Sequence, residues 1–154
     1  MKKTFVVIFS VLICLLVGFI ASRFQSQSIS EWYPTLDKPS LTPPNYVFPL
    51  MWNILYVFMG VSIALIINKK IPSESFFIKV FSLQLILNFL WSICFFYFQN
   101  PLLGLIDIVL LLAVIIFYAV KAYPVHKISS ILFIPYIIWV GFATYLNLYI
   151  FINN

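Results

Sequence analysis

The sequence predicts an all-α integral membrane protein, a bundle of five transmembrane helices with a proline-rich lid loop between the first two. The first observation is composition: 64% of the residues are hydrophobic and 8% are charged, whereas a soluble domain carries about 25% charged residues. The second is a mean hydropathy of +1.09. The third is a series of long apolar runs, each long enough for the roughly 20 residues that cross a bilayer core. We treat residues 1–154 as one domain.

The first span is predicted at approximately 5–25. Lys2 and Lys3 followed by an apolar run also fit a secretory signal peptide. The run is long for such a peptide, however, and no clean cleavage site of small residues follows it. We therefore expect the segment to be retained as a helix.

Four further apolar segments qualify as spans, because in lipid a helix satisfies its own backbone hydrogen bonds. Polar or proline-containing breaks separate them, and three of the connections are very short. Consecutive helices are therefore expected to be antiparallel neighbours. The predicted spans are approximately 44–68, 76–98, 102–121 and 127–151.

The basic residues predict the orientation. They stand singly or in pairs at the ends of apolar runs, which is typical of topology signals and not of a nucleic-acid surface. Arg23 and Lys38 fall on the side of the long loop, 26–43, which is therefore expected to lie outside, with the N-terminus in the cytoplasm. The opposite side holds Lys2, Lys3, Lys69, Lys70, Lys79, Lys121 and Lys127.

No metal site is predicted. Cys14 and Cys94 lie inside apolar runs, where cysteine usually acts as a small hydrophobic residue. His126, the one histidine, falls in a loop at the opposite end from the long loop and fits an interfacial residue better than a haem ligand. No Ser-His-Asp or Cys-His arrangement is present for acid–base catalysis.

The segment from Trp32 to Phe48 is predicted to be a stiff lid. Each proline fixes its own φ angle and restricts the residue before it. A stiff loop loses less entropy when it closes over a ligand. Pro44 is also well placed to begin the second helix. The prolines of this segment are Pro34, Pro39, Pro43 and Pro44.

Beneath this loop, aromatic and amide side chains repeat at helical spacing on three spans. At about 1.5 Å per residue, most of them fall in the half of the bundle nearest the loop, together with Asp107, the one acid within a span. Ligand sites have this composition, mostly apolar with a few polar groups. The stripes are Phe48, Trp52, Tyr56 and Gly60; Gln84, Asn88, Trp91 and Phe95; and Pro135, Trp139, Ala143 and Asn147.

Other interpretations of these residues stay open. Aromatic stripes commonly pack helices together, and Gln and Asn commonly bridge helices through hydrogen bonds. Trp32 and Tyr33 also fit an interfacial aromatic belt. Trp52, Trp91 and Trp139 lie too deep for such a belt.

With these motifs assembled, the chain resembles the TspO/MBR family, the tryptophan-rich sensory proteins related to the mitochondrial translocator protein. The resemblance covers nearly all of the chain after the first span. It rests on Trp32-Tyr33-Pro34-x-Leu36-x-Lys38-Pro39, Pro43-Pro44, Phe48, Trp52, Leu55-Tyr56, Gly60, Gln84-x3-Asn88-x2-Trp91, Asp107 and Pro135-Tyr136-x2-Trp139-x2-Phe142-Ala143-x2-Leu146-Asn147.

The resemblance implies a five-helix bundle in a bacterial cell membrane, surrounded by lipid, whose first loop caps a ligand pocket. It implies porphyrins such as protoporphyrin IX as ligands, with isoquinoline carboxamide and benzodiazepine-type drugs, no required cofactor, and a homodimer. It further implies light-dependent porphyrin degradation that involves Trp52 and Trp139. The ligand-binding residues that follow are Tyr33, Phe48, Trp52, Tyr56, Gln84, Asn88, Trp91, Phe95, Asp107, Trp139, Phe142, Ala143 and Leu146.

Two features depart from family expectations. The cholesterol motif of animal members needs a basic residue soon after a tyrosine, and none follows Tyr145 or Tyr149. A close dimer seam of small residues is not supported either, because the chain has 4 glycines, no GxxxG motif, and Gly60 alone in its span.

Several functions remain open from the sequence. The first is a receptor or carrier for a planar hydrophobic ligand, with Lys38 or Arg23 pairing with porphyrin propionates at the loop side. The second is a porphyrin-degrading enzyme whose chemistry comes from the ligand and an oxidisable tryptophan. The others are a tetrapyrrole or lipid transporter, a stress sensor, and a helper subunit that binds no small molecule.

Overall fold

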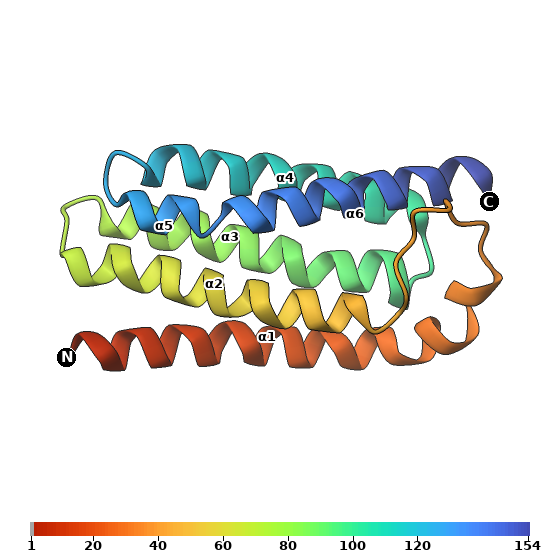
Figure 1. Ribbon diagram of the computed structural model, residues 1–154, viewed down its shortest axis with the longest axis horizontal. Coiled ribbons are helices and arrows are strands. Elements are labelled where there is room, and N and C mark those ends of the chain that lie inside the picture. The colour runs from red at the N-terminus through yellow and green to blue at the C-terminus, as the bar shows by residue number, and fades with distance from the viewer. Residues whose placement is uncertain (1) are drawn as a thin grey trace.

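Long helices run side by side along one axis in the computed structural model, which describes residues 2–154 (Figure 1). Five regions are long and apolar enough to cross a membrane, and no strand occurs in the described residues. The predicted five-helix membrane bundle is therefore confirmed. The α-helices are α1 (Lys3–Glu31), α2 (Val47–Lys69), α3 (Glu74–Ser92), α4 (Pro101–Ala122), α5 (Lys127–Ile131) and α6 (Ile134–Asn153), with a 3₁₀ turn η1 (Tyr33–Thr35) and a π-helical turn η2 (Ile93–Tyr97).

Helix α1 is longer than the predicted span of 5–25, because it continues through the polar residues to Glu31. Local side-chain bonds support these extra turns: the Ser30 hydroxyl donates to the carbonyl of Gln27 at 2.9 Å, and the Gln27 amide donates to Glu31 at 3.1 Å. No proline occurs before Pro34 to interrupt the helix. The loop therefore begins at Trp32, the predicted first residue of the lid, and not at residue 26.

The start of α2 also differs from the prediction. Pro44 does not begin the helix; its carbonyl accepts a bond of 3.0 Å from the Val47 amide, which closes a turn just before α2. An earlier turn is closed by Thr42, whose amide donates to Pro39 at 3.0 Å. The prolines therefore shape the loop as a chain of turns, and the helix starts only after the last of them.

Two of the predicted spans are interrupted helices. The third widens into the π-helical turn η2, where the Phe98 amide donates to Ile93 at 2.9 Å. The fifth breaks between α5 and α6, because Pro135 in the first turn of α6 has no amide hydrogen to continue the earlier helix. Each interruption rotates the following residues relative to a regular helix, which changes the face that they present.

Glycines allow α1 to approach α2 very closely. A Cβ atom on Gly60 would lie 2.5 Å from the Cα of Val11, and one on Gly18 would lie 2.2 Å from the ring of Tyr56. Real Cβ atoms do not tolerate such distances, so both positions require glycine for this packing. Gly60 is the one glycine of its span and does not belong to a GxxxG motif. It serves the packing of α2 against α1 within one chain.

Candidate functional site

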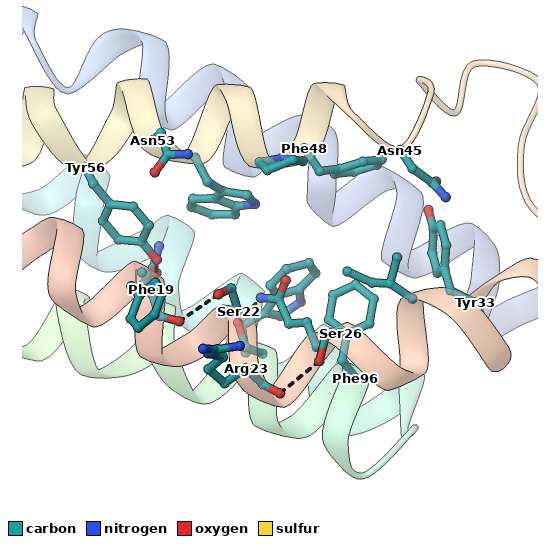
Figure 2. Close-up of a pocket in the computed structure, with 18 residues that line it drawn as sticks. Phe19, Ser22, Arg23, Ser26, Tyr33, Asn45, Phe48, Asn53, Tyr56 and Phe96 are labelled. Carbon is teal, nitrogen blue, oxygen red and sulfur yellow. Dashed lines mark hydrogen bonds between the residues drawn. The ribbon is translucent and has the colours of Figure 1, made fainter.

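A cavity of about 540 Å³ lies between α1, α2 and α3 at the end of the bundle nearest the lid. Figure 2 shows its two sides, with Asn53 and Tyr56 on α2 facing Ser22 and Arg23 on α1. The residues that line it are Gly18, Phe19, Ser22, Arg23, Gln25, Ser26, Ile29, Tyr33, Asn45, Phe48, Pro49, Trp52, Asn53, Tyr56, Asn88, Trp91, Ser92 and Phe96.

Two indole rings dominate the apolar wall. The rings of Trp52 and Trp91 have centroids 6.2 Å apart and planes inclined by 37°. Trp52 also lies 6.0 Å from Tyr56, and Trp91 stacks on Phe95 at 5.5 Å with an interplanar angle of 17°. These contacts fix the rings, so the cavity offers a rigid aromatic surface for a planar molecule.

A chain of hydrogen bonds runs from the cavity wall into the bundle. The Tyr56 hydroxyl donates to Oδ1 of Asn88 at 2.5 Å, and Nδ2 of Asn88 donates to the Tyr136 hydroxyl at 2.9 Å. Tyr136 in turn donates to Oε1 of Gln84 at 2.9 Å. Asn88 is therefore held from both sides by tyrosines, and one of its two amide hydrogens is left for another acceptor.

Trp91 is oriented by a second set of bonds. Its Nε1 donates to Oδ1 of Asn147 at 3.1 Å, and Nδ2 of Asn147 donates to the Pro101 carbonyl at 2.7 Å. Asn147 is fully buried. This residue of the fifth-span stripe therefore supports the cavity wall without touching the cavity.

The lid closes the end of the cavity through Tyr33, of which 6% is exposed. Burial raises the pKa of Tyr33 to about 12. Nζ of Lys38 lies 4.8 Å from the centre of the Tyr33 ring and donates to the carbonyls of Tyr33 at 2.7 Å and Leu36 at 3.2 Å. Asn154 exchanges two bonds with the backbone of Asp37, at 2.8 and 3.1 Å.

Six of the thirteen ligand-binding residues predicted from the sequence line this cavity. Phe95, Ala143 and Leu146 instead line a second cavity of about 20 Å³. Tyr33, Phe48 and Trp91, together with Phe96, line both cavities and therefore form the wall between them. The six that line the larger cavity are Tyr33, Phe48, Trp52, Tyr56, Asn88 and Trp91.

Gln84, Asp107, Trp139 and Phe142 line neither cavity. Gln84 is fully buried in the tyrosine network described above. The Trp139 ring packs against Phe48 at 5.9 Å and against Phe142 at the same distance, so Trp139 is not across the cavity from Trp52. Oδ2 of Asp107 and Nε1 of Trp139 are buried without a hydrogen-bond partner among the described residues.

The first helix contributes a whole wall that the sequence interpretation missed. Gly18, Ser22, Gln25 and Ile29 follow one another at steps of four, three and four residues, which places them on one helix face. That spacing, with polar residues at the end of an apolar run, was the available signal. The interpretation missed it because it found stripes only on the second, third and fifth spans and assigned residues from 26 onward, including Ile29, to a loop.

No group of three or more His, Cys, Asp or Glu gathers to hold a metal ion within residues 2–154. Nδ1 of His126 accepts a bond of 3.3 Å from the Ser129 amide and so caps α5. This histidine directly precedes α5, which lies at the end of the bundle opposite the lid (Figure 1).

Comparison with known proteins gives one consistent result. The model of the TspO/MBR family matches residues 10–152. A tryptophan-rich protein TspO of Chlorobaculum tepidum is 42% identical over 88% of this chain and 87% of its own length. One of Archaeoglobus fulgidus is 41% identical over 94% of both chains. The human translocator protein is 30% identical over 88% of this chain and 82% of its own length.

Proposed function

Because the chain belongs to the TspO/MBR family, we propose that it is a membrane receptor for planar hydrophobic ligands, above all porphyrins such as protoporphyrin IX. The observation that carries this proposal is the aromatic cavity of about 540 Å³ under the lid. Its size is within the range of roughly 300–1,000 Å³ that small-molecule sites occupy. Its lining is mostly apolar with a few amides and hydroxyls, as such sites usually are.

The two indole rings supply the main contact in this proposal. Trp52 and Trp91 form adjacent, gently inclined surfaces, and a flat macrocycle gains both apolar burial and favourable ring contacts against them. The remaining amide hydrogen of Asn88 offers one directed bond to a ring nitrogen or to the carbonyl of an isoquinoline carboxamide. The same cavity therefore suits both ligand types.

Binding is tested by titrating protoporphyrin IX into the purified protein in detergent and following tryptophan fluorescence together with the porphyrin absorbance band. We expect saturable quenching with a matching band shift, and displacement of the porphyrin by an isoquinoline carboxamide. Absence of saturable binding would leave a helper subunit that binds no small molecule as the better description.

A matched pair of variants tests the location. Ser22→Phe places a ring into the cavity and should weaken porphyrin binding strongly, because Ser22 lines it. Ser75→Phe makes the same change on α3 at the exposed opposite end and should leave binding unchanged. Equal effects of both variants would place the ligand elsewhere.

Light-dependent porphyrin oxidation is a second candidate function, supported by the position of Trp52 in the cavity wall. A bound porphyrin absorbs light and converts dissolved oxygen to reactive species. The electron-rich indoles that touch the ligand, Trp52 and Trp91, would then be the nearest oxidisable side chains. The variants that test this reaction are described in the Discussion.

A further inference from the structure

One side chain that lines the cavity carries a positive charge. Arg23 is the single Lys or Arg in the lining, and no Asp or Glu stands among the described residues that form it. The Arg23 guanidinium lies 5.1 Å from the centre of the Phe19 ring. Stacking on this ring limits its movement but neutralises no charge. The cavity therefore holds a cation without a carboxylate partner in its walls.

The other basic residue on this side is already engaged. Lys38 donates to two loop carbonyls and covers the Tyr33 ring. It also does not line the cavity. Of the two cations that the sequence offered for pairing with an acidic ligand, the structure leaves Arg23 available.

The cavity is closed at the lid and exposed at its side. Tyr33 is 6% exposed at the lid end, whereas Phe19 on α1 is 58% exposed. Arg23 and Asn53 are also exposed, on the facing edges of α1 and α2. Figure 2 shows these edges on opposite sides of the cavity, with Tyr33 at one end of it.

Asn53 adds a second polar group at this opening. It lies in the second turn of α2, on a helix that crosses the membrane. Its carboxamide makes no side-chain hydrogen bond to another described residue, whereas Gln25 on α1 donates to Ser92 at 2.5 Å. An unpaired amide at such a position is available to a ligand.

We infer that the cavity opens sideways between α1 and α2, and that Arg23, assisted by Asn53, binds there the carboxylate of an amphiphilic ligand whose apolar body lies against Trp52 and Trp91. A guanidinium forms two parallel hydrogen bonds with a carboxylate. This inference rests on the proposed function, since porphyrins with propionate side chains belong to this chemical class. The inference adds two points to that function. The carboxylate of the ligand is required for tight binding, and it lies at the opening between α1 and α2, which faces the bilayer.

The test compares protoporphyrin IX with its dimethyl ester, which has the same ring but no carboxylate. In neutral detergent the wild-type protein should bind the free acid at least about tenfold more tightly, as expected for a charge-assisted hydrogen bond. Arg23→Gln should lower the affinity for the acid to that for the ester and leave ester binding unchanged. Arg23→Lys should restore part of the preference.

Two matched variants complete the test. Lys121→Gln removes a cation that lies over Phe117 at 5.7 Å, at the other end of the bundle, and should keep the preference. Lys38→Gln should keep it too. Loss of the preference in Lys38→Gln but not in Arg23→Gln would overturn the inference in favour of the lid. Equal wild-type affinity for acid and ester would refute acid recognition, whereas binding of neither compound would refute the proposed function itself.

Discussion

Tyr56 on α2 donates a hydrogen bond of 2.5 Å to Asn88 on α3, at the wall of the cavity. Both residues are buried. Removing the hydroxyl leaves a carbonyl oxygen of Asn88 without its partner in an apolar surrounding. Interhelical hydrogen bonds in membrane proteins contribute on the order of 1 kcal/mol.

Tyr56→Phe is therefore expected to lower the free energy of unfolding by about 1 kcal/mol. Unfolding by sodium dodecyl sulfate, followed by circular dichroism, measures the change. Tyr145→Phe is the matched control, because 42% of Tyr145 is exposed. A Tyr56 variant as stable as the control variant would contradict the structural importance of this bond.

Asn88→Ala is expected to weaken isoquinoline carboxamide binding by about 1 kcal/mol or more. The substitution removes the amide hydrogen available to a ligand and also releases Tyr56 and Tyr136. A competition titration against bound porphyrin measures the loss. Asn153→Ala, at an exposed position whose amide donates only to Tyr149, should bind like the wild type. An unchanged affinity in Asn88→Ala, with the fold intact, would move the drug site elsewhere.

Trp52→Phe is expected to slow the light-driven loss of bound porphyrin strongly, while binding stays within about tenfold, roughly 1.4 kcal/mol. Phenylalanine keeps an aromatic surface but lacks the oxidisable indole. Trp139→Phe should degrade porphyrin like the wild type, because Trp139 does not line the cavity. Absorbance under illumination in air, with a dark control, gives both rates. Wild-type rates in both Trp52→Phe and Trp91→Phe would remove the chemical basis for an enzyme, because both indoles line the cavity.

Cysteine labelling tests the orientation predicted from the basic residues. In a Cys94→Ser background, an impermeant reagent added outside intact cells should modify a cysteine at Leu41, which is 67% exposed on the lid. It should not modify a cysteine at Ser73, which is exposed at the opposite end. Ser28 is a poor labelling position because it is buried and donates to the Phe96 carbonyl. The reverse labelling pattern would place the N-terminus outside.

Asn154→Ala is expected to loosen the lid. The Asp37 amide donates to Asn154 at 2.8 Å, so its hydrogen exchange reports this contact directly. Loss of about 1 kcal/mol corresponds to roughly fivefold faster exchange. Asn153→Ala should leave exchange at Asp37 unchanged. Unaltered exchange in Asn154→Ala would show that the prolines alone hold the loop.

The helices were predictable because hydrophobic length alone identifies a span in lipid. The ends of the helices were harder to predict. The last turns of α1 are polar and are supported by local hydrogen bonds of serine and glutamine side chains, so hydrophobicity does not reveal them. The π-helical turn η2 has no sequence signal comparable to the proline in α6. Within this turn Phe95 lines the smaller cavity and not the larger one, whereas Phe96 lines both.

The candidate site was predictable in part for a similar reason. Depth arguments placed Trp52, Asn88 and Trp91 at a similar level, and all three line one cavity, because helix rise fixes how far each residue lies from the loop. Depth carries no information about rotation or about which helices are neighbours. Trp139 is therefore at a plausible depth but packs behind Phe48, and the wall from α1 was overlooked.

Asn154, at the C-terminal end, is hydrogen-bonded to Asp37 in the lid. The N-terminal end, described from Lys2 onward, makes no such contact with the lid, because it lies at the opposite end of the bundle. Figure 1 shows the C-terminal end beside the lid and the N-terminal end at the far side of the bundle. An affinity tag or fluorescent protein joined to Asn154 would press against the loop that covers the cavity and would alter ligand measurements. Fusions for purification and imaging are therefore best placed at the N-terminal end, away from the lid (Figure 1).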